Sequence, residues 1–102
     1  MNSMDVIAIK YEEARAEFAK MFQSSNSLAE ESERLAKYSQ EVSGGEYWQG
    51  TDAQAYAEKL YEFGTKLSTQ AAGLYELTQL LARQADENEQ LEIQQAQDIA
   101  NR

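Results

Sequence analysis

Residues 43–51 read Ser43-Gly44-Gly45-Glu46-Tyr47-Trp48-Gln49-Gly50-Thr51, in a chain of 102 residues that has five glycines and no proline. Glycine tolerates the left-handed backbone conformation that ends many helices, so Gly44 is the expected cap of a preceding helix. Thr51 followed by Gln54 fits a capping box that would open a second helix. The segment is too short to form an element of its own. It therefore predicts a turn between two helices that fold back as an antiparallel hairpin.

The stretch before this turn has the spacing of an amphipathic helix, with apolar or small residues stepping by four and three. One position of the seam reads Ile7, Ala14, Met21, Leu28, Leu35 and Val42. The other position changes from Tyr11 and Phe18 to Ser25, Ser32 and Ser39. Small side chains in that second half would let a neighbouring helix approach closely.

The stretch after the turn repeats the spacing with Ala53, Tyr56, Leu60, Phe63, Leu67, Gln70, Leu74, Leu77 and Leu81. A second row of small residues, Ala57, Gly64 and Ala71, recurs every seven residues on the flank of this seam. Two interpretations of Gly64 and Gly73 stay open. They are tolerated defects that each cost up to about 1 kcal/mol relative to alanine, or they belong to a smooth strip for close helix contact.

These patterns predict one all-α domain, an antiparallel two-helix hairpin with helix 1 at about 5–42, a turn at about 43–51 and helix 2 at about 52–85. If Val42 lies opposite Ala53, Ile7 lies opposite Asn88, and the acidic, glutamine-rich residues 86–102 overhang as a polar tail that is expected to fray. The predicted helix–helix seam consists of Ile7, Tyr11, Phe18, Met21, Leu28, Leu35, Val42, Tyr56, Leu60, Phe63, Leu67, Leu74, Leu77 and Leu81.

More apolar residues are present than two contacting stripes can bury. Phe22 on the first helix and Tyr61, Tyr75 and Leu80 on the second lie off the main seam. A hairpin with apolar flanks of this kind is expected to pair with another into a four-helix bundle dimer. The alternative is that Tyr61 and Tyr75 are half-exposed single aromatics of an ordinary surface.

Composition narrows the possible functions. The formal net charge of −9 disfavours nucleic acid as a partner, and the absence of cysteine and histidine removes the commonest nucleophile, general base and metal ligands. The acidic runs, including Asp86-Glu87 and Glu89, are expected on solvated faces. We therefore expect no enzyme activity, no cofactor and no metal site. Because the longest apolar run, Val6 to Ile9, is short, no stable membrane insertion is expected, and the N-terminus is not expected to act as a cleavable signal peptide.

The tripeptide Trp48-Gln49-Gly50 lies near the middle of this proline-free, acidic chain, between two predicted helices. On these features the sequence resembles the WXG family, the early-secreted-antigen-like small helical hairpins exported by type VII (ESX-type) secretion systems. The resemblance covers essentially the whole chain. It implies a secreted, virulence-associated substrate or co-substrate that forms a homodimer or a heterodimer with another WXG-type protein. It also implies that Trp48 and Gly50, with Tyr47 beside them, take part in recognition by the type VII export ATPase. From the residues alone, Trp48 could instead simply plug the open end of its own hairpin.

One feature departs from the family pattern. Many members or their partners carry Tyr-x-x-x-Asp/Glu after the second helix as an export signal, whereas here Tyr75 is followed four places on by Gln79 and Tyr61 by Thr65. Either the signal is a looser one after Leu81, or it lies on another protein. In the second case the chain would be an adaptor that accompanies a larger toxin of the LXG type. An intracellular coiled-coil scaffold is the remaining alternative.

Overall fold

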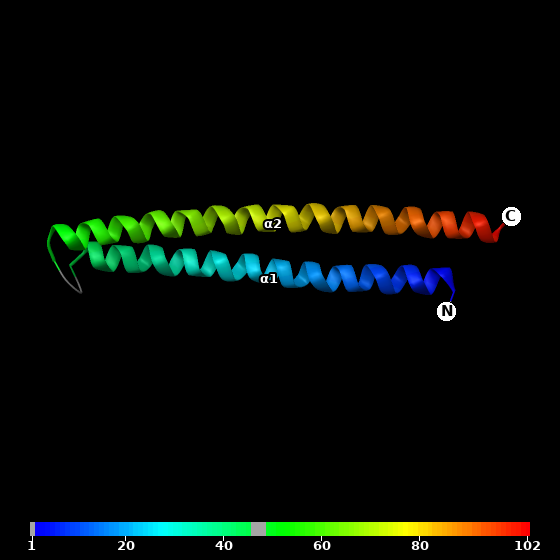
Figure 1. Cartoon of the computed structure of the whole chain (residues 1–102), viewed down its shortest axis with the longest axis horizontal. Coiled ribbons are helices and arrows are strands. Elements are labelled where there is room, and N and C mark those ends of the chain that lie inside the picture. The colour runs from blue at the N-terminus through cyan, green and yellow to red at the C-terminus, as the bar shows by residue number, and fades with distance from the viewer. Residues whose placement is uncertain (1, 46–48) are drawn as a thin grey trace. The chain divides into compact units, whose positions relative to one another are not determined.

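Two long helices make up nearly all of the computed structural model, which describes residues 2–45 and 49–102 (Figure 1). Helix α1 spans Ser3–Ser43 and helix α2 spans Thr51–Ala100. No strand occurs in either described range, so the all-α prediction is confirmed. The expected end of the second helix near residue 85 is not observed, because α2 continues through the segment predicted to fray. Tyr47 and Trp48 lie outside the described residues.

The chain divides into two compact units, which are described separately. The turn unit is Gln23–Leu74, and the terminal unit combines Met1–Phe22 with Tyr75–Arg102. Each unit therefore contains part of α1 and part of α2.

In the turn unit, three serines of α1 donate hydrogen bonds to backbone carbonyls of α2. Ser25 Oγ donates to the carbonyl oxygen of Ala71 (3.1 Å), Ser32 Oγ to that of Gly64 (2.8 Å) and Ser39 Oγ to that of Ala57 (2.7 Å). The donors advance by seven residues along α1 while the acceptors go back by seven along α2. The two helix segments are therefore antiparallel, and the heptad spacing of both is used. We call this contact the serine ladder.

The serine ladder corrects the predicted face of α2. Tyr56 and Phe63 were expected in the seam, but their side chains are 46% and 59% exposed. Leu77 and Leu81, in the terminal unit, are also exposed. The row of small residues that contains Ala57 and Gly64 faces α1 instead. A serine hydroxyl reaches a backbone carbonyl of the next helix only if the two backbones come close, and bulky side chains at those positions would hold them apart.

The remaining seam residues are covered to different degrees. Val42 is fully buried and forms a small core with Ala53 and Ala57, against which Tyr38 and Leu60 pack. Tyr11 is buried in the terminal unit. The others are half-buried: Ile7, Phe18, Met21, Leu28, Leu35, Leu60, Leu67 and Leu74.

The terminal unit contains few bulky buried side chains. Among residues 2–22 and 75–102, the buried ones are Thr78, Ala85 and Tyr11. Phe22 and Tyr75, both expected off the seam, contact each other with ring centroids 5.2 Å apart and ring planes at 59°. This tilted arrangement is one that aromatic pairs favour. It covers Phe22 partly, while Tyr75 stays exposed.

Candidate functional site

The turn between α1 and α2 is shaped by two glycines with positive φ, Gly45 (79°) and Gly50 (109°). Gly44, the expected left-handed cap, does not have positive φ; its N–H donates to the carbonyl oxygen of Gln40 at 2.8 Å and so continues the helical pattern. The N–H of Gly45 then donates to the carbonyl oxygen of Val42 at 3.1 Å. The left-handed position therefore lies one residue later than predicted.

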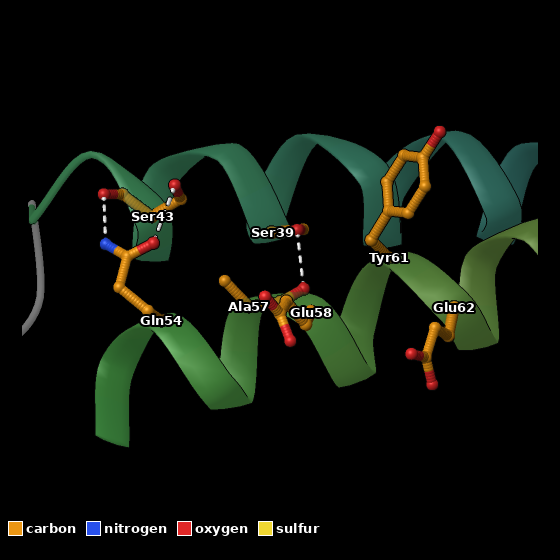
Figure 2. A pocket seen from close by; sticks show the side chains of 7 residues that line it. All are labelled: Ser39, Ser43, Gln54, Ala57, Glu58, Tyr61 and Glu62. Atoms are coloured by element: carbon orange, nitrogen blue, oxygen red, sulfur yellow. Dashed lines mark hydrogen bonds between the residues drawn. The ribbon is translucent and has the colours of Figure 1, made fainter. Parts of the chain in front are cut away.

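Gln54 links the two helices at this end. Its backbone N–H donates to the carbonyl oxygen of Gly50 (3.2 Å), which opens α2. Its side-chain amide Nε2 donates to the carbonyl oxygen of Ser43 (3.0 Å), and Ser43 Oγ donates to its Oε1 (3.4 Å) (Figure 2). The capping box predicted from Thr51 and Gln54 is therefore not formed. Instead, Gln54 of α2 and Ser43 of α1 form two hydrogen bonds, which we call the Gln54–Ser43 exchange, and one of them satisfies a free carbonyl at the C-terminal end of α1.

A groove of about 280 Å³ adjoins this link, entirely within the turn unit (Figure 2). It is lined by Ser39, Ser43, Gln54, Ala57, Glu58, Tyr61 and Glu62. The Tyr61 side chain is 62% exposed, and Figure 2 shows its ring on the α1 side while the Glu62 carboxylate points away from α1. The Ser39 hydroxyl is already donated to the carbonyl oxygen of Ala57. The groove therefore combines the carboxylates of Glu58 and Glu62 with the aromatic ring of Tyr61.

A second polar cluster lies in the terminal unit, around Arg15. Its Nη2 is 2.7 Å from Asp86 Oδ1 and 2.7 Å from Glu89 Oε1, and its Nη1 is 3.3 Å from Glu89 Oε2. These charge-assisted bonds raise the pKa of Arg15. Asp86 and Glu89 were expected on a solvated face. In the structure they instead contact Arg15, which the prediction did not include.

One turn further along α2, a single carboxylate oxygen of Glu92 accepts hydrogen bonds from two α1 side chains. Lys10 Nζ lies 2.8 Å and Tyr11 Oη 2.9 Å from Glu92 Oε1. The Lys10 and Tyr11 hydrogen bonds lower the pKa of Glu92. The bond to Glu92 raises the pKa of Lys10, and burial, followed by that same carboxylate, raises the pKa of Tyr11. Lys10 Nζ also lies 5.2 Å from the centroid of the Tyr11 ring.

The sequence does contain a signal for these contacts. Asp86, Glu89 and Glu92 recur every three residues, and Lys10 and Arg15 provide cations on the helix expected to lie opposite. The expected register placed Ala14 opposite Leu81, and residues 86–102 were expected to overhang with nothing in the hairpin covering them. In the terminal unit, Arg15 instead reaches residues 86 and 89.

Of the predicted recognition residues, the structure describes Gly50, which lies exposed immediately before α2. Trp48 and Tyr47 are outside the described ranges, so their role stays a prediction. Among residues 2–45 and 49–102, no group of three or more acidic side chains is arranged to hold a metal ion. In the same ranges neither helix has a stretch that is long and apolar enough to cross a bilayer.

Comparison with known proteins gives no relative. No protein-family model matches the sequence, and no curated protein or solved structure matches the chain.

Proposed function

We propose that this chain is a small substrate or co-substrate of a type VII secretion system, which acts through helix–helix dimerisation and docking to the export machinery. The observation that carries the proposal is the place of Trp48-Gln49-Gly50 in the sequence. The tripeptide occupies the short connection between the end of α1 at Ser43 and the start of α2 at Thr51. A Trp-x-Gly connection between two long helices is the feature on which the resemblance to the WXG family rests.

The backbone at the connection supports this proposal. Gly50 has φ of 109°, a conformation that side-chain-bearing residues rarely adopt. A glycine requirement at the third position of the tripeptide thus has a physical reason in this chain. The proposed recognition surface consists of Trp48, Gly50 and Tyr47.

Dimerisation is the second part of the proposal. Phe63 and Tyr61 of the turn unit are exposed, as are Leu77 and Leu80 of the terminal unit. Burial of one such side chain contributes roughly 1.5–3 kcal/mol, so a few of them decide whether two hairpins associate. The proposed partner is a second copy or another WXG-type protein.

The test of export compares the chain in a bacterium with an active type VII system and in the same strain lacking the export ATPase. The protein is expected in the culture medium of the first strain only. Release that continues without the ATPase contradicts the proposal and favours the intracellular scaffold or another export route.

Trp48→Ala tests the recognition surface, with Gln49→Ala at the neighbouring variable position as its matched control. Trp48→Ala is expected to reduce export strongly while the helical circular dichroism of the purified chain is retained. Gln49→Ala is expected to leave export unchanged. A collapse of helicity in Trp48→Ala, with normal docking of the remaining folded fraction, would show that the indole is structural.

The adaptor alternative is favoured by one observation, the lack of a Tyr-x-x-x-Asp/Glu sequence. An adaptor is expected to leave the cell only when a larger type VII toxin is co-expressed. A substrate is expected to leave without it. Expression with and without such a toxin therefore distinguishes the two roles.

A further inference from the structure

The two units of the chain are held together by different interactions. Three ion pairs join α1 to α2 within the terminal unit: Arg15–Asp86, Arg15–Glu89 and Lys10–Glu92. The described ion pair of the turn unit, Glu31–Arg34, lies within α1. The helices of the turn unit are instead joined by the serine ladder, by the Gln54–Ser43 exchange and by the core around Val42.

Few apolar contacts support the end of α2. No residue from 86 to 100 is buried, and Leu91 and Ile99 are exposed. The partly buried residues of this segment are Glu89, Glu92, Ile93 and Ala96, and the side chains of the two glutamates are 19% and 33% exposed. The described hydrogen bonds and ion pairs of this segment with α1 are made by Asp86, Glu89 and Glu92.

We propose that Lys10, Tyr11 and Arg15 form an electrostatic clasp that holds residues 86–92 of α2 against α1, and that this clasp opens at high ionic strength or in acid while the turn unit stays folded. Salt has access to the clasp, because Lys10 and Asp86 are more than half exposed. Opening uncovers Tyr11 and releases α2 beyond Ala85. This device is a property of the chain itself and does not depend on export.

The direction of the pH dependence follows from the groups that act on Glu92, which are Lys10 and Tyr11 from α1. Glu89, one turn earlier on α2, acts on Tyr11. The pKa of Glu92 is lowered in the folded chain, so its stabilisation is present above the ordinary carboxyl pKa and is lost as pH falls through the lowered value. The pKa of Lys10 is raised, so its contribution is lost only as pH rises through that raised value. The contact of Glu92 with Lys10 and Tyr11 is therefore present at neutral pH, and acid opens it by protonating Glu92.

Amide hydrogen exchange of the full chain at neutral pH tests the proposal. Arg15→Gln is the test variant, and Arg34→Gln is the matched control, because the Arg34 partner Glu31 lies on the same helix. Arg15→Gln is expected to speed exchange in residues 86–100 about tenfold or more and to leave residues 23–43 and 51–74 protected. Arg34→Gln is expected to leave residues 86–100 unchanged.

Two further tests use added salt and a reversal of the charges of Lys10 and Glu92. About 1 M NaCl is expected to speed exchange in residues 86–100 of the unsubstituted chain, and less so in Arg15→Gln, whose clasp is already open. Lys10→Glu alone is expected to open the clasp, and its combination with Glu92→Lys to close it again. The proposal is overturned if exchange in residues 86–100 does not respond to Arg15→Gln or to salt. It is also overturned if both units lose protection together, because the contacts would then support the whole fold.

Discussion

Ser32 and Gly64 face each other backbone to backbone: Ser32 Oγ donates to the Gly64 carbonyl oxygen at 2.8 Å, and a Cβ atom on Gly64 would lie 3.3 Å from the Ser32 carbonyl oxygen. That distance is shorter than ordinary van der Waals contact, and the obstructing atom belongs to a backbone that cannot move aside like a side chain. Gly64 is therefore part of the close approach between α1 and α2. Of the two interpretations that the sequence left open, the smooth strip applies to this glycine.

Gly64 and Gly73 provide a matched pair for testing that approach. A Cβ atom on Gly73 meets nothing within 4 Å, so Gly73→Ala is expected to raise the free energy of unfolding by up to about 1 kcal/mol through helix propensity alone. In Gly64→Ala the same gain is opposed by the contact with Ser32, and the net effect is expected to be near zero or unfavourable. Gly64→Leu is expected to cost about 1–3 kcal/mol through overpacking. Urea unfolding followed by circular dichroism measures all three, and equal stabilisation by both alanine variants would mean that the helices do not approach closely.

Val42 and Val6 form a second pair, which tests the core of the turn unit. Val42 is fully buried and Val6 is exposed. Val42→Ala is expected to lower the free energy of unfolding by about 1–3 kcal/mol, because it removes buried methyl groups and leaves a cavity. Val6→Ala is expected to change it by less than about 0.5 kcal/mol. Similar losses in the two variants would argue against a core centred on Val42.

The fold class and the heptad spacing could be predicted from sequence, but the face of α2 that meets α1 could not. Tyr56 and Phe63 follow the same seven-residue step as Ala57 and Gly64, one position away. Hydrophobicity favours the aromatic row. The serines of α1 determine which row of α2 faces α1, because Ser25, Ser32 and Ser39 each donate a hydrogen bond to a backbone carbonyl that must lie close. Periodicity within one helix contains no information about that pairing.

The contacts of the segment after residue 85 could not be predicted for a related reason. Its composition is polar, and polar segments that lack a covering surface are expected to fray. The contacts that attach it, such as Arg15 with Glu89, join residues far apart in the sequence and depend on the register of the terminal unit. The role of Trp48 stays a prediction.

Gly50 tests the backbone geometry of the connection. Its φ of 109° strains any residue with a side chain, and nothing within 4 Å would obstruct a Cβ atom there. Gly50→Ala is therefore expected to cost about 1–3 kcal/mol of stability from backbone strain alone. Gln49→Ala, at the exposed neighbouring position, is expected to cost much less. Thermal unfolding of the two variants makes the comparison, and equal melting temperatures would show that the connection adapts to an alanine at position 50.

Phe63 tests whether the exposed row of α2 is a dimer surface. Because Phe63 is 59% exposed, Phe63→Gln is expected to leave the helicity of the dilute chain unchanged. If two copies bury this side chain against each other, its loss removes roughly 1.5–3 kcal/mol per buried ring and weakens association by about tenfold or more. Leu67→Ala, at a half-buried position one turn away, is the contrasting variant and is expected to lower the stability of the hairpin itself. Analytical ultracentrifugation over a concentration series measures association, and circular dichroism measures folding. A dimer that forms equally well with Phe63→Gln would place the contact on another face. A loss of helicity in that variant would instead mean that Phe63 packs within its own chain.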